Sequence, residues 1–180
     1  ALVPVEPVEG DPGCRGNRFG RLDILVNGAG IMLLDSAPHT AVEEWDRMIS
    51  LNVAALLHVT HAAVPHLIYA ASTSPRQVAD LVNVGSTAGR AARPGSSVYG
   101  LTRSGLRAFT ESLRQELLGE RVRVGLVEPG TVDTARDAAR GRIDGIEAPR
   151  PADIADAIGY VVTRERRIAV NEILMSASAW

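Results

Sequence analysis

Residues suited to proton transfer stand in the middle of the chain, at the expected ends of a strand and a helix. Ser86 follows an apolar, strand-like run, and Tyr99 stands where a helix is expected to begin. A tyrosine on the first turn of a helix, near a serine at a strand end, suits proton transfer to a carbonyl or alcohol oxygen. Because a phenol's unperturbed pKa is about 10, the tyrosine needs a neighbouring cation near neutral pH. Arg103 lies one turn further along the same expected helix and can supply that charge.

Each of these residues has a commoner structural explanation when taken alone. A serine after a strand is more often a cap or turn residue, and Asn52 within a helix is usually solvated or capping. Ser86 also lacks the surroundings of a nucleophile elbow and a histidine placed to serve it, which disfavours a cofactor-free hydrolase. His58, His61 and His66 do not have the spacing of an HExxH pair, so we expect no metal site.

The elements that would position these residues follow from hydrophobic periodicity. Short apolar runs predict strands at residues 22–27, 81–86, 122–130 and 171–176. Amphipathic stretches predict helices at residues 41–70, 97–118 and 151–162. Thr40 and Glu43 have the spacing of a capping box before the first helix, and Pro151 suits the first position of the last one. The polar, Gly- and Arg-rich residues 131–150 are expected to form a loop or short helix.

Alternating strands and helices of this length predict one α/β domain over residues 21–180. Right-handed crossovers would place helices on both faces of a parallel sheet, and such sheets bind ligands at the carboxyl ends of their strands. Residues 1–20 differ, because prolines and glycines interrupt any helical stripe. We expect residues 1–20 to be an irregular remnant of an N-terminal half.

Composition excludes several classes of partner and chemistry. A formal net charge of -2 gives no reason to expect nucleic acid or an anionic membrane. No apolar run is expected to reach the roughly 18–20 residues that cross a bilayer. The single Cys14 fits a reducing cytoplasm. All 19 basic residues are arginine, which excludes any mechanism that needs a lysine amine.

From Arg21 onward the chain resembles the classical short-chain dehydrogenase/reductase family. LDILVNGAG resembles the family's strand followed by an NNAG motif, with Gly28 in place of the second Asn. LNV matches the site of the catalytic-helix Asn, and LVNVGS places Ser86 where the family has its substrate-orienting serine. VYGLTRSG resembles the YxxxK motif, and EPGTVDT resembles the PGxxxT segment.

The resemblance implies a Rossmann-like doubly wound parallel sheet and an NAD(P)-dependent oxidoreductase. Hydride would pass between NADP or NAD and a small alcohol, ketone or aldehyde. Tyr99 would move the proton, Ser86 would hold the substrate oxygen, and Asn52 would fix a water in a proton relay, with Arg103 in the lysine's place. The resemblance implies cofactor contacts at Asn27, Gly28, Ala29, Gly30, Tyr99, Arg103, Pro129, Gly130, Val132 and Thr134.

The sequence departs from the family pattern in two ways. The family lysine is Arg103, which keeps the positive charge but cannot lose its proton, so we expect reduced turnover. No TGxxxGxG turn is present, so the chain is expected to be N-terminally incomplete, lacking the first strands and the glycine-rich turn. The residue that selects NAD or NADP normally follows the second strand, so the sequence leaves that choice open.

A second hypothesis is a catalytically inactive fragment or pseudoenzyme that keeps only the family's assembly scaffold. The two long helices commonly pair across subunits in this family, so residues 41–70 and 97–118 are expected to mediate a homodimer or homotetramer. The substrate cannot be read from the sequence. Arg90, Arg93 and Arg136 would suit an acidic substrate, but surface arginines explain them more simply.

Overall fold

The fold is described here from a computed structural model, which describes residues 20–130, 132 and 146–179. The main helices are α2 (Val42–Ile49), α3 (Leu56–Thr73), α4 (Ser97–Glu116) and α5 (Pro151–Val162), with a π-helical segment at Ser50–Ala55 between α2 and α3. The strands are β1 (Ile24–Asn27), β2 (Ala79–Val84), β3 (Val122–Pro129), β4 (Ile146–Glu147), β5 (Glu172–Met175) and β6 (Ser178–Ala179). Two short 3-10 turns, η2 (Thr87–Gly89) and η3 (Leu118–Glu120), complete the described elements.

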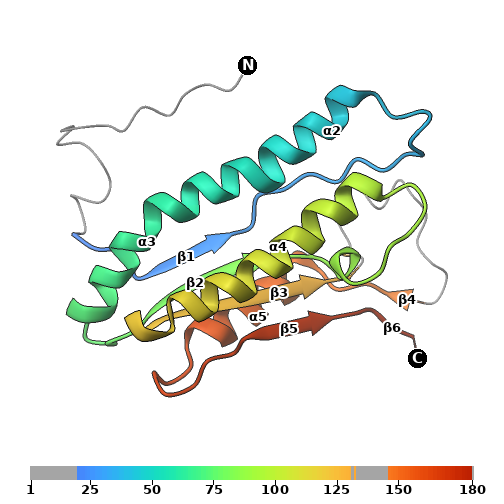
Figure 1. The fold of residues 1–180 in the computed structure, drawn as a ribbon. Helices are drawn as coiled ribbons and strands as arrows, with labels where there is room; N and C mark the ends of the chain where they lie inside the picture. Colours follow the sequence, from blue (N-terminus) through green and yellow to red (C-terminus); the bar gives the residue numbers. More distant parts are fainter. Residues whose placement is uncertain (1–19, 131, 133–145, 180) are drawn as a thin grey trace.

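A four-stranded parallel sheet in the order β1-β2-β3-β5 forms the centre of the fold (Figure 1). Leu25 of β1 pairs with Leu81 of β2, Val82 of β2 with Gly125 of β3, and Val127 of β3 with Ile173 of β5. The four predicted strands and their parallel arrangement are therefore confirmed. The antiparallel ribbon of β4 and β6 was not predicted, because two-residue strands leave no period-two pattern to detect.

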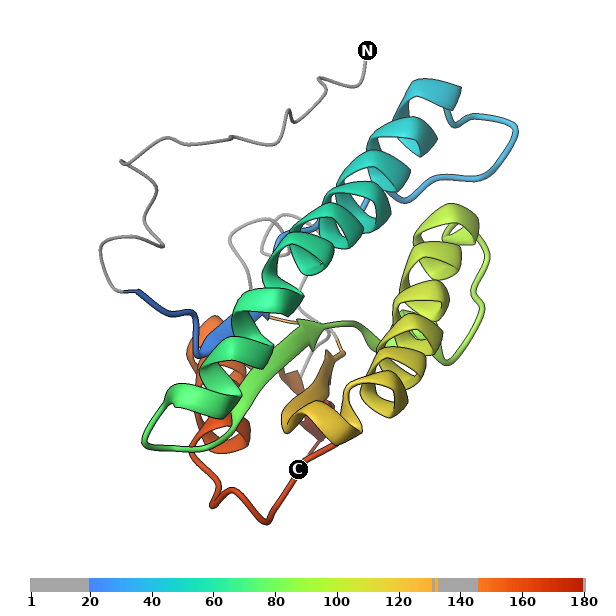
Figure 2. The same cartoon turned by 60° about the vertical axis from the view of Figure 1, so that its left-hand side comes forward.

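Helices cover both faces of the sheet, as the doubly wound prediction requires (Figures 1 and 2). Side chains alternate between the two faces of a strand, so Leu81 and Val124 face one layer while Val82 and Val127 face the other. On the first face the core includes residues of α3 and α4, among them Ala63, Leu67, Ala70, Ala71 and Leu113. On the second face it includes residues of α5, Ile154 and Val161.

The helical path from Val42 to Thr73 differs from the prediction in three respects. Thr40 and Glu43 do not form a capping box: the helix is capped at Ala41 without a side-chain bond, and the Thr40 hydroxyl donates to the Ser36 carbonyl. The helix continues past Pro65 to Thr73, beyond the expected end at residue 70. A π-helical segment that the apolar pattern did not reveal separates α2 from α3.

The same stretch contradicts the expectation about membrane-crossing length. Val42–Thr73 is long and apolar enough to cross a bilayer by length and composition. A core helix passes the same test, and Leu67, Ala70 and Ala71 of α3 are fully buried against the sheet. The apolar stretch was missed because His58 and His61 break its continuity without adding a formal charge.

β1 is the edge strand of the described sheet, with Ile24 and Val26 about two-fifths exposed at 38% and 41%. Residues 1–19, and with them most of the expected irregular remnant, lie outside the described residues, so that expectation stays a prediction. Of the expected loop at 131–150, only Val132 and residues 146–150 are described. Pro151 does occupy the first turn of α5 as predicted.

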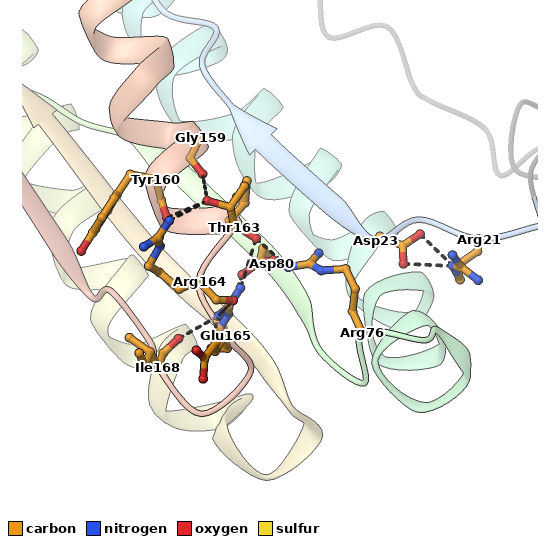
Figure 3. Close-up of polar contacts among 12 residues, drawn as sticks. Arg21, Asp23, Arg76, Asp80, Gly159, Tyr160, Thr163, Arg164, Glu165 and Ile168 are labelled. Atoms are coloured by element: carbon orange, nitrogen blue, oxygen red, sulfur yellow. Dashed lines mark hydrogen bonds and ion pairs between the residues drawn. The ribbon is translucent and has the colours of Figure 1, made fainter.

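A buried carboxylate ties the strands together at their amino ends (Figure 3). Asp80 of β2 is fully buried and accepts hydrogen bonds from Arg76 Nη2 at 2.6 Å and Arg123 Nε at 2.7 Å. Arg76 also donates to the carbonyl of Val162, the last residue of α5, and Arg123 donates to that of Ile168 in the connection to β5. The connection from α5 to β5 therefore depends on this ion pair for its position.

Replacing Asp80 tests this dependence. Asp80→Asn leaves two guanidinium groups facing a neutral amide, so we expect the free energy of unfolding to fall by about 3–5 kcal/mol. Asp23→Asn is the matched control, because Asp23 pairs with Arg21 at the surface and an exposed pair is worth about 1 kcal/mol or less. Urea denaturation of the three proteins measures both changes. Equal losses in the two variants would show that the Asp80 ion pair does not hold the connection.

Candidate active site

Ser86 and Tyr99 lie on adjacent elements at the carboxyl end of β2. Ser86 caps η2, and its Oγ accepts a hydrogen bond from the Ala88 N–H at 3.2 Å. η2 packs against the start of α4, where a Cβ added to Gly100 would lie 3.7 Å from the Ala88 carbonyl. Further along, the Ser104 hydroxyl donates to the Gly89 carbonyl at 3.0 Å. Ser86 thus has the capping role expected of a serine after a strand, at a place that borders the tyrosine helix.

Tyr99 and Arg103 stack on one another in the first turns of α4. The guanidinium carbon of Arg103 lies 5.0 Å from the centre of the Tyr99 ring, and both side chains are buried. A cation over an aromatic face is attracted by the ring's quadrupole. The predicted one-turn relation between the two residues is confirmed.

Only some of the N–H groups of Arg103 have a hydrogen-bond partner among the described residues. Its Nη1 donates to the Val84 carbonyl at 3.4 Å, at the end of β2. Its buried Nε has no hydrogen-bond partner among the described residues. A buried donor without an acceptor is costly, so this N–H marks a place where an acceptor would bind favourably.

Gly30 allows the chain after β1 to pass close to Arg103. A Cβ at this position would overlap Arg103 Nη2 and lie 3.2 Å from Asn52 Oδ1. Gly28 has no such neighbour, since a Cβ there would meet only Val84 at 3.8 Å. Gly28, Ala29 and Gly30 are exposed, so the three predicted cofactor-contacting residues form open main chain beside the Arg103 guanidinium.

Asn52 holds the same segment from the helical side. Within the π-helical segment, its Oδ1 accepts from the Ile31 N–H and its Nδ2 donates to the Ile31 carbonyl, each at 2.8 Å. Nδ2 also lies 3.4 Å from Thr102 Oγ1, and Asn52 is 2% exposed. Asn52 is therefore neither a solvated nor a capping residue. Both amide hydrogens have protein acceptors, and the contact with a relay water stays a prediction.

Asn27 belongs to a chain of hydrogen bonds that the sequence did not reveal. Its Nδ2 donates to Thr60 Oγ1 at 3.0 Å and to Asn83 Oδ1 at 2.9 Å. Asn83 in turn donates to Thr110 Oγ1 at 2.9 Å. These bonds join β1, β2, α3 and α4 through otherwise apolar layers. They hold the carboxyl end of β1 in place, and a direct cofactor contact by Asn27 stays a prediction.

The Pro-Gly segment after β3 borders the serine turn. Gly130 N–H donates to the Met175 carbonyl at 2.8 Å, and a Cβ added to Gly130 would lie 3.8 Å from Thr87 Cγ2. Pro129 is buried and pairs in register with Met175, while Val132 packs on the α5 side of the core. Thr134 and Arg136 lie outside the described residues. Of the described members of this predicted cofactor segment, Gly130 therefore lies beside η2, which follows Ser86.

A buried ion cluster beneath the serine turn was missed by sequence reasoning. Glu128 of β3 is 1% exposed, and Arg90 Nε donates to its Oε2 at 2.6 Å. Arg90 also pairs with Glu172, which lies 3.4 Å from Arg107 Nε. Gly85 makes room for the cluster, since a Cβ there would lie 3.2 Å from Glu128 Cγ. An acid within an apolar strand run is the one sequence signal that points to it.

The two carboxyl groups of this cluster shift in opposite directions. Burial raises the pKa of Glu128, against the opposing hydrogen bond from Arg90. Burial also disfavours ionised Glu172, but hydrogen bonds from Arg90 and Glu128 outweigh it and lower the pKa of Glu172. The serine turn thus rests on a cluster whose charge depends on pH.

Comparisons with known proteins agree with this architecture. A family model described as short chain dehydrogenase matches residues 15–142. An uncharacterized oxidoreductase of Staphylococcus aureus (strain USA300) is 36% identical over 155 residues, which cover 86% of this chain and 64% of that protein. The chain belongs to the short-chain dehydrogenase family. It spans somewhat less than two-thirds of the length of this curated relative.

Two solved structures show the same fold. The closed form of a serine dehydrogenase complexed with NADP+ has a TM-score of 0.79 at 31% identity, covering 89% of this chain and 66% of that chain. A 3-ketoacyl-(acyl-carrier-protein) reductase from Brucella melitensis, complexed with NADH, has a TM-score of 0.75 at 27% identity, covering 88% of this chain and 68% of that chain. The Rossmann-like prediction for the fold is confirmed.

The close approach at Gly30 generates the first prediction for the site. Gly30→Ala would drive a methyl group against Arg103 Nη2, so we expect about 1–3 kcal/mol of destabilisation from overpacking. Gly28→Ala is the control, because the space around Gly28 accepts a Cβ. Thermal and urea unfolding of both variants provide the measurement. If the two variants lost equal stability, Arg103 would not occupy the position described.

The ion cluster generates a prediction about pH. Folding raises the pKa of Glu128 above its unfolded value of 4.5. The stability that Glu128 contributes is therefore fully present below pH 4.5 and is lost as the pH rises through the folded pKa. The lowered pKa of Glu172 makes its contribution present above pH 4.5 and lost as pH falls through the folded pKa. As pH rises, Glu128→Gln should therefore gain stability relative to the unaltered protein, and Glu172→Gln should lose it. Urea denaturation at pH values on both sides of 4.5 measures both trends. Trends of the same sign in the two variants would refute the opposite pKa shifts of Glu128 and Glu172.

Proposed function

We propose that this chain carries the catalytic centre of an NAD(P)-dependent oxidoreductase that interconverts an alcohol and a ketone or aldehyde. The observation that supports this most directly is the buried Tyr99–Arg103 stack beside the Ser86 turn, at the carboxyl ends of parallel strands. Solved relatives complexed with NADP+ and with NADH support a nicotinamide cofactor. The single Cys14 supports a reducing cytoplasm as the place of action.

The residues around Arg103 fit the nicotinamide end of such a cofactor. Gly28, Ala29 and Gly30 offer exposed main chain, and a side chain at Gly30 would fill the space beside Arg103. The unused N–H of Arg103 Nε has the chemistry to bind a ribose hydroxyl. The sequence does not contain the glycine-rich turn with which the family binds pyrophosphate, so these residues account for only one end of the cofactor.

In the proposed mechanism, the protein's own groups manage the proton and the substrate oxygen. NAD(P) supplies or receives the hydride when bound. Tyr99 donates its phenolic proton to the carbonyl oxygen during reduction and accepts it from the alcohol during oxidation. Ser86 donates a hydrogen bond to that oxygen, since its Oγ already accepts from Ala88 and keeps its own proton available.

Arg103 stabilises the phenolate form of Tyr99 by its charge. Unlike the lysine that it replaces, a guanidinium cannot pass a proton onward, so this site holds charge without relaying protons. The stacked geometry places the cation over the ring face, at 5.0 Å from its centre. We therefore propose that Tyr99 exchanges its proton with solvent slowly, regaining it after reduction and losing it after oxidation, and that this exchange limits turnover.

The apolar surface of the two long helices favours the scaffold hypothesis as a second function. Leu57, Val59 and Tyr69 of α3 are 40%, 49% and 56% exposed, and Leu101 of α4 is 62% exposed. An interface between subunits through these helices would cover exposed apolar side chains of both. We propose a homodimer or homotetramer through α3 and α4, which would exist with or without catalysis.

Nucleotide binding and turnover, measured on the protein as its host produces it, separate the two functions. Saturable fluorescence changes with NADPH or NADH are expected, followed by slow oxidation of the reduced nucleotide with a panel of ketones and aldehydes. Arg103→Lys should raise the turnover about tenfold or more, because a proton relay becomes available. Tyr99→Phe should lower the turnover about a hundredfold, while the nucleotide still binds.

Tyr160→Phe is the matched control, since Tyr160 also stacks on an arginine, Arg164 at 4.1 Å, but lies on the exposed face of α5. This control should leave turnover unchanged. Absence of any saturable nucleotide binding, with a stable oligomer in sedimentation, would reject the enzyme and favour the scaffold. Turnover that survives in Tyr99→Phe would reject the assigned proton donor.

A further inference from the structure

A groove rich in arginine lies at the amino ends of the strands, at the opposite end of β2 from Ser86. Its volume is about 560 Å³. The residues that line it come from the start of β2 and β3, the end of α4 and the connection from α5 to β5. This arginine groove is lined by Gln77, Val78, Arg114, Leu118, Arg121, Val122, Arg123, Val124, Arg166, Arg167, Ala169 and Asn171.

The arginine groove combines an apolar floor with a cationic rim. Val78, Val122 and Val124 are buried at 4%, 3% and 2% exposure and form the floor. Five of the residues that line the groove are arginines, and the lining contains no aspartate or glutamate. This contrasts with the whole chain, whose formal net charge is -2. The positive charge is therefore concentrated here against the overall balance.

Three of the five guanidinium groups already have a carboxylate partner. Arg123 pairs with the buried Asp80, which fixes it at the floor of the groove. Arg114 pairs with Glu111 one turn away on α4, and Arg167 pairs with Glu165 at the surface. These arginines give the groove its shape, and their charge is largely compensated.

Arg121 and Arg166 are the two whose charge is not compensated. The main-chain carbonyl of Arg121 accepts from the Ala79 N–H, but its guanidinium has no hydrogen-bond or ion-pair partner among the described residues. Arg166 binds only the neutral side-chain oxygen of Gln77. Both are exposed at the rim, and they come from segments far apart in the sequence, the turn after η3 and the connection after α5. Two uncompensated guanidinium groups facing one groove are suited to a multiply charged anion.

We propose that the arginine groove binds a small organic phosphate, an anion that carries an apolar body. The phosphate oxygens would accept hydrogen bonds from Arg121 and Arg166, and the apolar body would lie against the exposed side chain of Leu118, above the buried valines of the floor. Arginine forks match phosphate oxygens geometrically, and covering the exposed apolar surface of Leu118 adds affinity that inorganic phosphate alone cannot gain. This site is separate from the proposed catalytic centre and does not depend on the proposed function.

The probe for this site is 1-naphthyl phosphate, titrated by its fluorescence into the purified protein. We expect saturable binding of one molecule per chain, about tenfold or more tighter than inorganic phosphate, because the naphthyl ring covers the exposed Leu118 side chain. The double variant R121G/R166A should weaken binding about tenfold or more. Glycine is chosen at 121 because Arg121 has φ 57°, a backbone conformation that glycine adopts freely.

The control R21A/R47A removes two exposed arginines on other parts of the molecule, with the same change in net charge. It should bind 1-naphthyl phosphate as the unaltered protein does. Equal weakening in both double variants would mean unspecific attraction and overturn the proposal, as would a titration without saturation. Displacement of the probe by NADPH together with unweakened probe binding in R121G/R166A would place the probe at the nucleotide site and also overturn the proposal. A failure here leaves the proposed oxidoreductase unaffected, since neither Arg121 nor Arg166 is part of its centre.

Discussion

The rest of the site depends on the two hydrogen bonds between the side-chain amide of Asn52 and the main chain of Ile31. β1 lies at the edge of the described sheet and its pairing with β2 ends at Asn27, so the sheet does not hold the segment that follows. Asn52 replaces the missing support by binding both the N–H and the carbonyl of Ile31. This brings Gly30 against Arg103, and Arg103 in turn stacks on Tyr99. The position of the tyrosine's cation thus follows from one buried amide.

Much of the fold could be predicted because hydrophobic periodicity records which side of an element is buried. The helix predicted at 97–118 is α4 at Ser97–Glu116, and the strand predicted at 122–130 is β3 at Val122–Pro129. Features set by individual tertiary contacts could not be predicted. The Thr40 hydroxyl bonds a carbonyl of the preceding turn instead of capping the helix, and the π-helical segment leaves the apolar pattern unchanged.

In the site, too, contacts within one element could be predicted and contacts between elements could not. Tyr99 and Arg103 are four residues apart on one helix, so local geometry was enough to bring them together. Asn52 and Ile31, or Arg90 and Glu128, meet only after the sheet and helices have packed, and no local pattern links them. A polar residue inside an apolar run, such as Glu128 or Asn83, indicates that a partner exists but does not identify it. The arginine groove is a further case, since its lining comes from four separate segments.

The π-helical segment at Ser50–Ala55 also limits how the helix before and after it can change in length. A π-helical turn accommodates an extra residue relative to an α-helix, and each residue of an α-helix turns the chain by about 100°. Loss of one residue here would therefore restore regular winding with little rotation of α2 relative to α3, whereas loss of one residue within the α-helical parts would rotate one end of the helix by about that angle. After such a rotation between them, Met48, buried where α2 meets α4, and Leu67, buried on the sheet, could not both keep their partners. In evolutionary terms, single-residue deletions in this helix should be confined to the π-helical segment.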